Sequence, residues 1–285
     1  MHNTARWPYI LLIAALSVVY HSNLRPIASG DTLPASLIPF SIWLDHTVRL
    51  DRFGPWVEAH QEYSSAVVRI RGHYYSGYPI AGPVLATPLY LPLAALRSLG
   101  NWDAGALIAL ARILEKFAAT SIAAFSAVLM LLLLRRLTSD SWAWGLTLVY
   151  ALGTVAWSAS SQALWQHTTG QLAIVGALLF LERWAGQRDS WVALWYCGAC
   201  AACALMIRPS NIMLLPALVA ALFAVRAKAV EYLRLLILPL AGGLLVLGYN
   251  IFLFRNASGA YSLSWLDGDL LEGFSGILFS PGEVC

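Results

Sequence analysis

About seven runs of apolar residues divide the chain, and short clusters of charged residues separate them. A membrane-spanning helix needs about 20 residues, and the runs are close to this length. They lack the alternation of apolar and polar residues that is typical of membrane strands. We therefore predict an all-α fold, a polytopic transmembrane helix bundle of about seven spans. The predicted spans are residues 7–22, 109–134, 141–158, 164–182, 190–207, 210–225 and 232–254.

One further apolar segment, residues 79–97, is long enough to span a membrane but contains four prolines. If this segment does not cross, the basic residues between the spans all fall on one side, which the positive-inside rule identifies as the cytoplasm. If this segment crosses the membrane, the basic residues that follow it move to the outer side. We therefore predict that it lies in the interface or re-enters, where a broken helix costs less. The basic residues concerned are Arg6, Arg135, Arg136, Arg183, Arg188, Arg226, Lys228 and Arg234.

This topology makes residues 1–285 a single transmembrane domain in the cytoplasmic (plasma) membrane, with the N-terminus in the cytoplasm. Residues 23–108 are the first extracytoplasmic loop, and it carries interfacial helices. In this loop, apolar residues precede charged ones over residues 33–53, a pattern typical of a helix on the membrane surface. Residues 109–254 form the bundle, and residues 255–285 form an outer C-terminal segment.

The composition agrees with a membrane protein, because only 12% of the residues are charged and 59% are hydrophobic. A soluble domain carries about 25% charged residues. The net charge of +3 comes from basic residues between the apolar runs, so no nucleic-acid partner is indicated. Phosphate-binding, zinc-protease and hydrolase motifs are missing from the sequence. Cys197, Cys200 and Cys203 fan around one helix and are interpreted as small packing residues, so no metal ligands are assigned.

Candidate chemistry is concentrated on the predicted outer side. Asp31 follows Gly30 just beyond the first span, where it is either a solvated turn residue or a functional acid. The stretch "RIRGHYYSGYPIAGP" gathers cations and tyrosines, which suit a lipid phosphate or a simple interfacial anchor. Its candidate binding residues are Arg69, Arg71, His73 and Tyr78.

Two further candidates lie at the outer ends of later spans. His167 in "LWQHTTGQ" is either a structural residue or a ligand-binding one, and Arg208 in "IRPSN" is costly there unless it snorkels, pairs or faces a wet cavity. Near the start of the second span, Arg112, Glu115 and Lys116 are functional candidates or interfacial anchors.

The order of these motifs resembles that of the GT-C superfamily of membrane glycosyltransferases, near the protein O-mannosyltransferase and aminoarabinose-transferase branch (glycosyltransferase family 39-like). The motifs are "SGDT", "GHYYSGYPIAGPVLATPLYLP", "LLRRL", "LWQHTTGQL" and "RPSNIMLLP". The resemblance implies transfer of a sugar, hexosyl or pentosyl, from a polyprenyl-phosphate donor to a hydroxyl of a lipid, glycan or protein acceptor in the cell envelope. Asp31 occupies the place of the family's catalytic acid, which deprotonates or orients that hydroxyl.

Arg69, Arg71, His73 and Arg208 are expected at the phosphate end for their chemistry and side of the membrane. The charged residue that opens the family's interfacial helix is missing from "SGYPIAGPVL", and "WQHT" stands where the family often has an aspartate, so His167 either substitutes for it or is structural. A divalent metal assists some members of the family, although no spacing in this sequence requires one.

The family continues into further spans where this sequence ends in "GILFSPGEVC", so the resemblance implies a C-terminal truncation. The alternative function is a non-catalytic membrane protein, either a transporter of lipid-linked saccharides or an inactive fragment. A transporter would carry charges deep within its helices, along a pathway. We expect a catalytic Asp31 to face a space that it shares with Arg69, Arg71 or His167.

Overall fold

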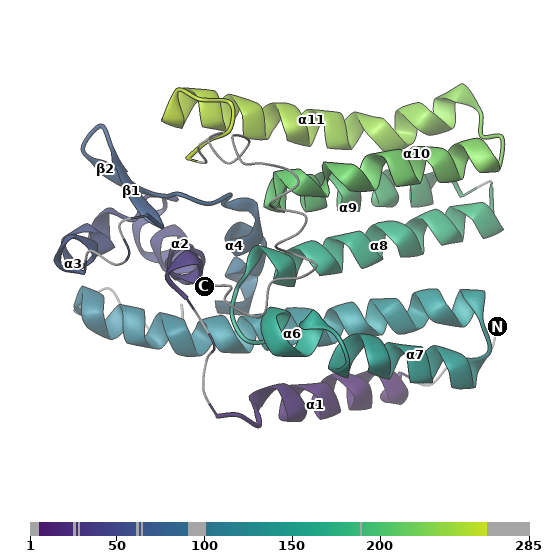
Figure 1. Cartoon of the computed structure of the whole chain (residues 1–285), viewed down its shortest axis with the longest axis horizontal. Helices are drawn as coiled ribbons and strands as arrows, with labels where there is room; N and C mark the ends of the chain where they lie inside the picture. Colours follow the sequence, from purple (N-terminus) through teal and green to yellow (C-terminus); the bar gives the residue numbers. More distant parts are fainter. Residues whose placement is uncertain are drawn as a thin grey trace, which may run out of the picture. The chain divides into compact units, whose positions relative to one another are not determined.

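The computed structural model describes residues 6–24, 27, 29–60, 63, 65–90, 101–188 and 190–260, and most of them are helical (Figure 1). The all-α prediction is confirmed except for one β-hairpin. The longer helices are α1 (Trp7–His21), α2 (Leu33–Asp45), α6 (Ala104–Leu137), α7 (Asp140–Leu152), α8 (Gln166–Gly186), α9 (Trp191–Ile207), α10 (Leu214–Ala224) and α11 (Ala229–Phe254). The short elements are α3 (Gly54–Ala59), α4 (Ala81–Ala86), β1 (Val67–Ile70) and β2 (His73–Ser76).

A helix occupies each of the seven predicted spans, but most of these helices are shorter than a membrane span. Two described helices, α6 and α11, are long and apolar enough to cross a membrane by length and composition. Three others are apolar but shorter, namely Trp7–His21, Trp191–Ile207 and Pro209–Ala224. A seven-span bundle therefore remains a prediction, because the structure supports membrane association only through two helices.

The chain divides into two compact units, residues 1–246 and residues 247–285. The first unit holds all the candidate site residues. The second contains the end of α11 and a turn in which Asn250 donates a hydrogen bond to the backbone oxygen of Ala257 at 3.0 Å. The predicted outer C-terminal segment, residues 255–285, is described only as far as residue 260.

Helix α6 is the element around which the first unit is organised (Figure 1). It begins at residue 104, five residues before the predicted boundary, because the side chain of Asp103 accepts a hydrogen bond from the N–H of Ala106 at 2.9 Å and caps the helix. Its last turn carries Arg135 and Arg136, which suit the negative end of the helix dipole. Helices α1, α2, α7 and α8 all pack against it.

Helices α1 and α6 run antiparallel, because contacts join their opposite ends. At one end, Arg135 donates to the hydroxyl of Tyr9 at 2.7 Å. At the other, Lys116 donates to the side-chain oxygen of Asn23, just after α1, at 3.3 Å. The end of α1 and the first turns of α6 therefore lie on the same side of this helix pair.

The segment that was predicted to lie in the interface, residues 79–97, is no continuous helix over its described part. It forms the six-residue α4 and a 3₁₀ turn, Thr87–Tyr90, and residues 91–97 lie outside the described part. Pro83 and Pro88 fall within these short pieces, where prolines shorten the helical hydrogen-bond ladder.

Helix α2 lies inside the protein, unlike the expected surface helix over residues 33–53. Leu37 and Phe40 belong to a core cluster that α2 shares with Tyr90 and the start of α6. Trp43 is half-buried and donates to the backbone oxygen of Thr87 at 3.4 Å. The protein thus covers much of the apolar side of α2.

The hairpin β1–β2 was missed from the sequence. Its strands pair antiparallel, with Val67 opposite Ser76 and Ile70 opposite His73. The turn residues Arg71 (φ 51°) and Gly72 (φ 86°) are both left-handed, as a two-residue type I′ hairpin turn requires. The hairpin places the predicted cations Arg69, Arg71 and His73 on one small sheet.

Candidate functional site

Asp31 lies in a 3₁₀ turn, Gly30–Thr32, that leads directly into α2. The side chain of Ser29 accepts a hydrogen bond from the backbone N–H of Asp31 at 3.1 Å and caps this turn. The Asp31 carboxylate is exposed, and its Oδ1 accepts a hydrogen bond from the hydroxyl of Tyr78 at 2.6 Å. The fold therefore joins two of the predicted site residues that lie far apart in the sequence.

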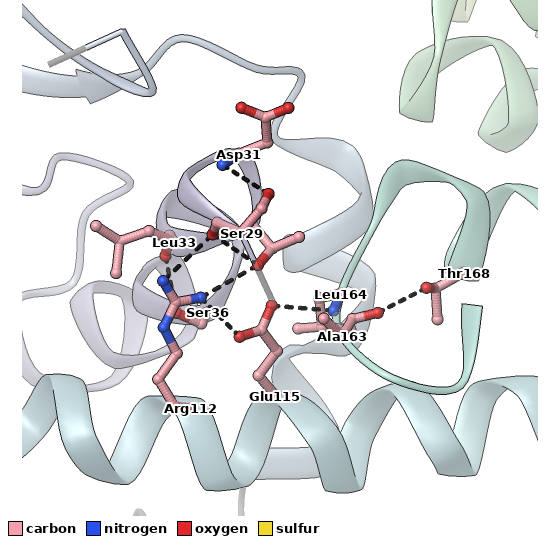
Figure 2. A network of polar contacts seen from close by, with 10 residues as sticks. Ser29, Asp31, Leu33, Ser36, Arg112, Glu115, Ala163, Leu164 and Thr168 are labelled. Atoms are coloured by element: carbon pink, nitrogen blue, oxygen red, sulfur yellow. Dashed lines mark hydrogen bonds and ion pairs between the residues drawn. The ribbon is translucent and has the colours of Figure 1, made fainter. Parts of the chain in front are cut away.

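An ion pair on α6, between a partly exposed arginine and a buried glutamate, lies beneath this turn (Figure 2). Arg112 Nη1 lies 3.0 Å from Glu115 Oε2, and the Glu115 side chain is completely buried. Arg112 also donates to Thr32 Oγ1 at 3.1 Å and to the backbone oxygen of Ser29 at 3.3 Å. The other Glu115 oxygen accepts from the backbone N–H of Leu164 at 3.1 Å, so the pair connects three segments of the chain.

Lys116, the next residue, belongs to a separate polar cluster. Its amino group donates to Asn23 and to the side-chain oxygen of Gln162, and Asn23 donates to the same Gln162 oxygen at 2.8 Å. This cluster joins the end of α1 to the loop that precedes α8. Amide oxygens thus satisfy the amino group of a lysine that is 6% exposed.

Two residues of the hairpin, Arg69 and His73, have carboxylate partners of their own. Arg69 lies 3.1 Å from Glu58, and both are exposed. Glu58 also accepts from the hydroxyl of Tyr74, and this hydrogen bond raises the pKa of the phenol. Arg71 is exposed at the turn. The charge of Arg69 is therefore partly neutralised from α3.

His73 is part of an aspartate–histidine pair. Its Nδ1 lies 2.9 Å from Asp51 Oδ2, while the other Asp51 oxygen accepts from the backbone N–H of Tyr74 at 2.8 Å. Arg49 lies 3.3 Å from His73 Nε2. The side chains of His73 and Asp51 are 45% and 40% exposed, so water screens the attraction between them.

His167 and Arg208 form the last group. Arg208 Nη1 lies 3.0 Å from His167 Nδ1, and it joins the first turn of α8 to the residue that follows α9. Within the described part of the chain, Arg208 is in no ion pair with a carboxylate. A cation beside an exposed imidazole and without an acidic partner is suited to an anionic ligand.

The structure brings some predicted site residues together and keeps others apart. Asp31 contacts Tyr78, and His167 contacts Arg208, but no described hydrogen bond or ion pair joins Asp31 to Arg69 or His167. The bonds of the Arg112–Glu115 pair and the Asp51–His73 contact were not foreseen. The spacing of Arg112 and Glu115, three residues apart on a helix, was the available signal.

The residues that the structure describes offer no preformed set of protein ligands for a divalent metal, which assists some members of the family that the sequence resembles. They contain no group of three histidine, cysteine, aspartate or glutamate side chains placed to hold a metal ion. Among the described residues, the hydrogen-bond partner of the Asp31 carboxylate is the hydroxyl of Tyr78. Magnesium prefers carboxylate oxygens and water in an octahedral arrangement.

Comparison with known proteins yields no matching family model, no matching curated protein and no matching solved structure. The function must therefore be inferred from the residues of this chain and their geometry.

Proposed function

We propose that the protein is a membrane glycosyltransferase that moves a sugar from a polyprenyl-phosphate donor to an acceptor hydroxyl at the extracytoplasmic face. The observation that carries the proposal is the exposed Asp31 carboxylate, which the Tyr78 hydroxyl holds at 2.6 Å at the start of α2. Asp31 also occupies the place of the catalytic acid in the motif order that resembles the GT-C superfamily. An exposed, oriented carboxylate has the chemistry that a general base needs.

The placement of charges along α6 supports a membrane position. No charged residue occurs between Phe117 and Leu134, a stretch of about 27 Å at about 1.5 Å per residue. This length is close to the thickness of the hydrocarbon core of a bilayer, about 30 Å. The turns of α6 before Lys116 would then project out of the hydrocarbon layer and carry α2 and Asp31 beside the headgroups.

The arginines at the opposite ends of the helices of the first unit support the proposed orientation. Four contacts gather predicted cytoplasmic residues at one end of the first unit: Arg135 with Tyr9, Arg136 with Glu182, Arg188 with the backbone of Val225, and Arg234 with the ring of Trp191. A common end that is rich in arginine is typical of the cytoplasmic side. Asp31, His167 and Arg208 would then lie on the outer side.

In the proposed reaction, the acceptor hydroxyl attacks the anomeric carbon of the donor sugar. Asp31 takes the hydroxyl proton as the new carbon–oxygen bond forms, and the bond between the sugar and the phosphate oxygen breaks. The leaving polyprenyl phosphate keeps the electron pair of that bond. The Tyr78 hydroxyl donates to Asp31 Oδ1 and leaves the other carboxylate oxygen for the acceptor.

Arg208 is the preferred candidate for holding the phosphate. It has an arginine's planar array of donors, which matches phosphate oxygens, and His167 is its described neighbour. Arg69 and His73 already pair with Glu58 and Asp51, and these contacts reduce their availability. We therefore propose that the hairpin only attracts the anionic lipid to the protein surface, without binding its phosphate specifically.

The alternative of a saccharide transporter predicts charges deep within the helices. In α6 the charged residues Arg112, Glu115 and Lys116 precede the uncharged stretch, and Arg135 follows it. This distribution favours chemistry at the membrane surface over a charged pathway.

The decisive experiment measures transfer of radiolabelled sugar from polyprenyl-phosphate donors to membrane acceptors. We expect Asp31→Asn to reduce the rate at least about hundredfold, since general bases contribute about 10²–10⁴-fold. Asp45→Asn is the matched control. It removes a carboxylate from the other end of α2, where Asp45 pairs with Arg52, and should keep most of the activity.

Full activity in Asp31→Asn would exclude Asp31 as the base. A folded, inserted parent protein without transfer activity for any donor would count against the glycosyltransferase proposal and favour the non-catalytic alternative.

A further inference from the structure

Arg112 contacts the chain on both sides of Asp31. One guanidinium nitrogen reaches the side chain of Thr32, immediately after Asp31, and the other reaches the backbone oxygen of Ser29, two residues before it (Figure 2). The same Ser29 oxygen accepts from Thr32 Oγ1 at 3.2 Å, which closes the turn on itself. One cation on α6 thus holds the turn from below, while the Asp31 carboxylate points away from it.

Glu115 fixes the guanidinium in turn. It binds Arg112 through one oxygen and the backbone of Leu164 through the other, and its side chain has no exposed surface. Leu164 lies three residues before His167, in a loop that Thr168 also braces by donating to the backbone oxygen of Ala163 at 2.8 Å. The ion pair therefore sets the position of two segments, one with Asp31 and one leading to His167.

A buried ion pair is a weak source of stability, because desolvation of the two charges offsets much of their attraction. In some proteins such pairs serve instead to specify one geometry. Here all the described bonds of Arg112 and Glu115 outside their own helix end on the Asp31 turn or on Leu164.

From this we infer that Arg112, oriented by Glu115, is a positioning residue that holds the Asp31 turn in its working geometry relative to the segment of His167. The inference rests on the proposed function for its catalytic meaning, but the positioning itself is a property of the fold. The described bonds of both residues end on the protein chain, and the proposed role is to position Asp31.

The first test measures hydrogen exchange of the backbone amides in residues 29–36, with the full chain in lipid nanodiscs. Arg112→Gln should speed exchange of these amides at least about tenfold, since it removes the bonds from a charged donor that close the turn. Arg112→Lys keeps the charge beside Glu115 but cannot reach all three oxygens, so we expect an intermediate effect.

Thr120→Val is the matched control. Thr120 is also buried on α6 and donates to the backbone oxygen of Ser161 at 3.1 Å, in the loop before α8, but it does not contact the Asp31 turn. It should leave exchange in residues 29–36 unchanged. Unchanged exchange of residues 29–36 in Arg112→Gln would overturn the inference. It would also be overturned if Arg112→Gln raised exchange equally throughout the protein, or if Thr120→Val raised exchange of residues 29–36 as much as Arg112→Gln does.

The second test measures sugar transfer by the same variants. We expect Arg112→Gln to lower kcat at least about tenfold with little change in the donor KM, Arg112→Lys to recover part of kcat, and Thr120→Val to behave like the parent. A larger effect on KM than on kcat would overturn the positioning role. If the parent transfers no sugar, the proposed function fails, while the exchange experiment still decides whether Arg112 positions the turn.

Discussion

At the scale of single residues, the best-defined contact of the candidate site is the hydrogen bond between Tyr78 and Asp31. A phenol at 2.6 Å restricts how the carboxylate can turn and occupies one of its two oxygens. Tyr78 is itself placed by its neighbourhood, because its backbone N–H donates to Ser76 Oγ at 3.0 Å at the end of β2. The segment that follows the hairpin therefore supplies a partner for an acid that lies on another segment.

We expect Tyr78→Phe to lower kcat for sugar transfer about tenfold, since hydrogen bonds to charged groups contribute about 1.5–3 kcal/mol. The measurement compares kcat and KM of this variant with those of Tyr75→Phe. Tyr75 is also a half-buried tyrosine of this hairpin region, and its hydroxyl has no described contact with Asp31. Equal kcat values in the two variants would show that the contact does not support catalysis.

At the scale of elements, close packing of α9 on α11 depends on a small residue. A Cβ atom added at Gly198 would lie 2.6 Å from the backbone oxygen of Leu235, a distance that real Cβ contacts do not show. Backbone cannot retreat as a flexible side chain can. Glycine at this position therefore sets the separation of the two helices in the first unit.

Gly198→Ala should destabilise the protein by about 1–3 kcal/mol, the usual cost of overpacking. Thermal unfolding in detergent is the measurement. The control is Gly145→Ala in α7, where an added Cβ meets no atom within 4 Å and the higher helix propensity of alanine favours stability. A Gly198→Ala variant that melts at or above the temperature of the parent would contradict the proposed close approach.

At the scale of the whole molecule, the proposed topology assigns opposite sides of the membrane to the hairpin and to the loop before α11. This proposal starts from the arrangement within the first unit, where α1 and α6 run antiparallel and the arginine-rich helix ends meet. The large apolar side chains exposed on α1 and α11, such as Leu11 and Leu244, are typical of surfaces that face lipid.

A membrane-impermeant maleimide tests this topology in intact cells, with the four native cysteines replaced. Arg71→Cys on the hairpin should react from outside, whereas Lys228→Cys should react only after the membrane is permeabilised, because the proposed orientation puts Lys228 in the cytoplasm. Labelling of both positions from the same side would refute the orientation.

Local sequence determined which stretches form helices. Long apolar runs with charged ends predicted α1, α6 and α11, and the described boundary of α11 at Phe254 coincides with the predicted one. The turn at Asp31 was also predictable, because a carboxylate beside a glycine just beyond an apolar run is a local turn pattern, whereas its catalytic role remains a proposal. Such features need only neighbouring residues, since hydrophobic length and turn chemistry act over a few positions.

Only the tertiary structure decided what these residues contact. The pairing of β1 with β2 was hidden because "RIRGHYY" was interpreted as a cation cluster, although its turn residues suit a hairpin. The burial of α2 depends on packing against α6, and the bonds of Arg112 and Glu115 to Ser29 and Leu164 join segments that are remote in sequence. One sequence by itself shows which groups need partners, but long-range packing chooses the partners.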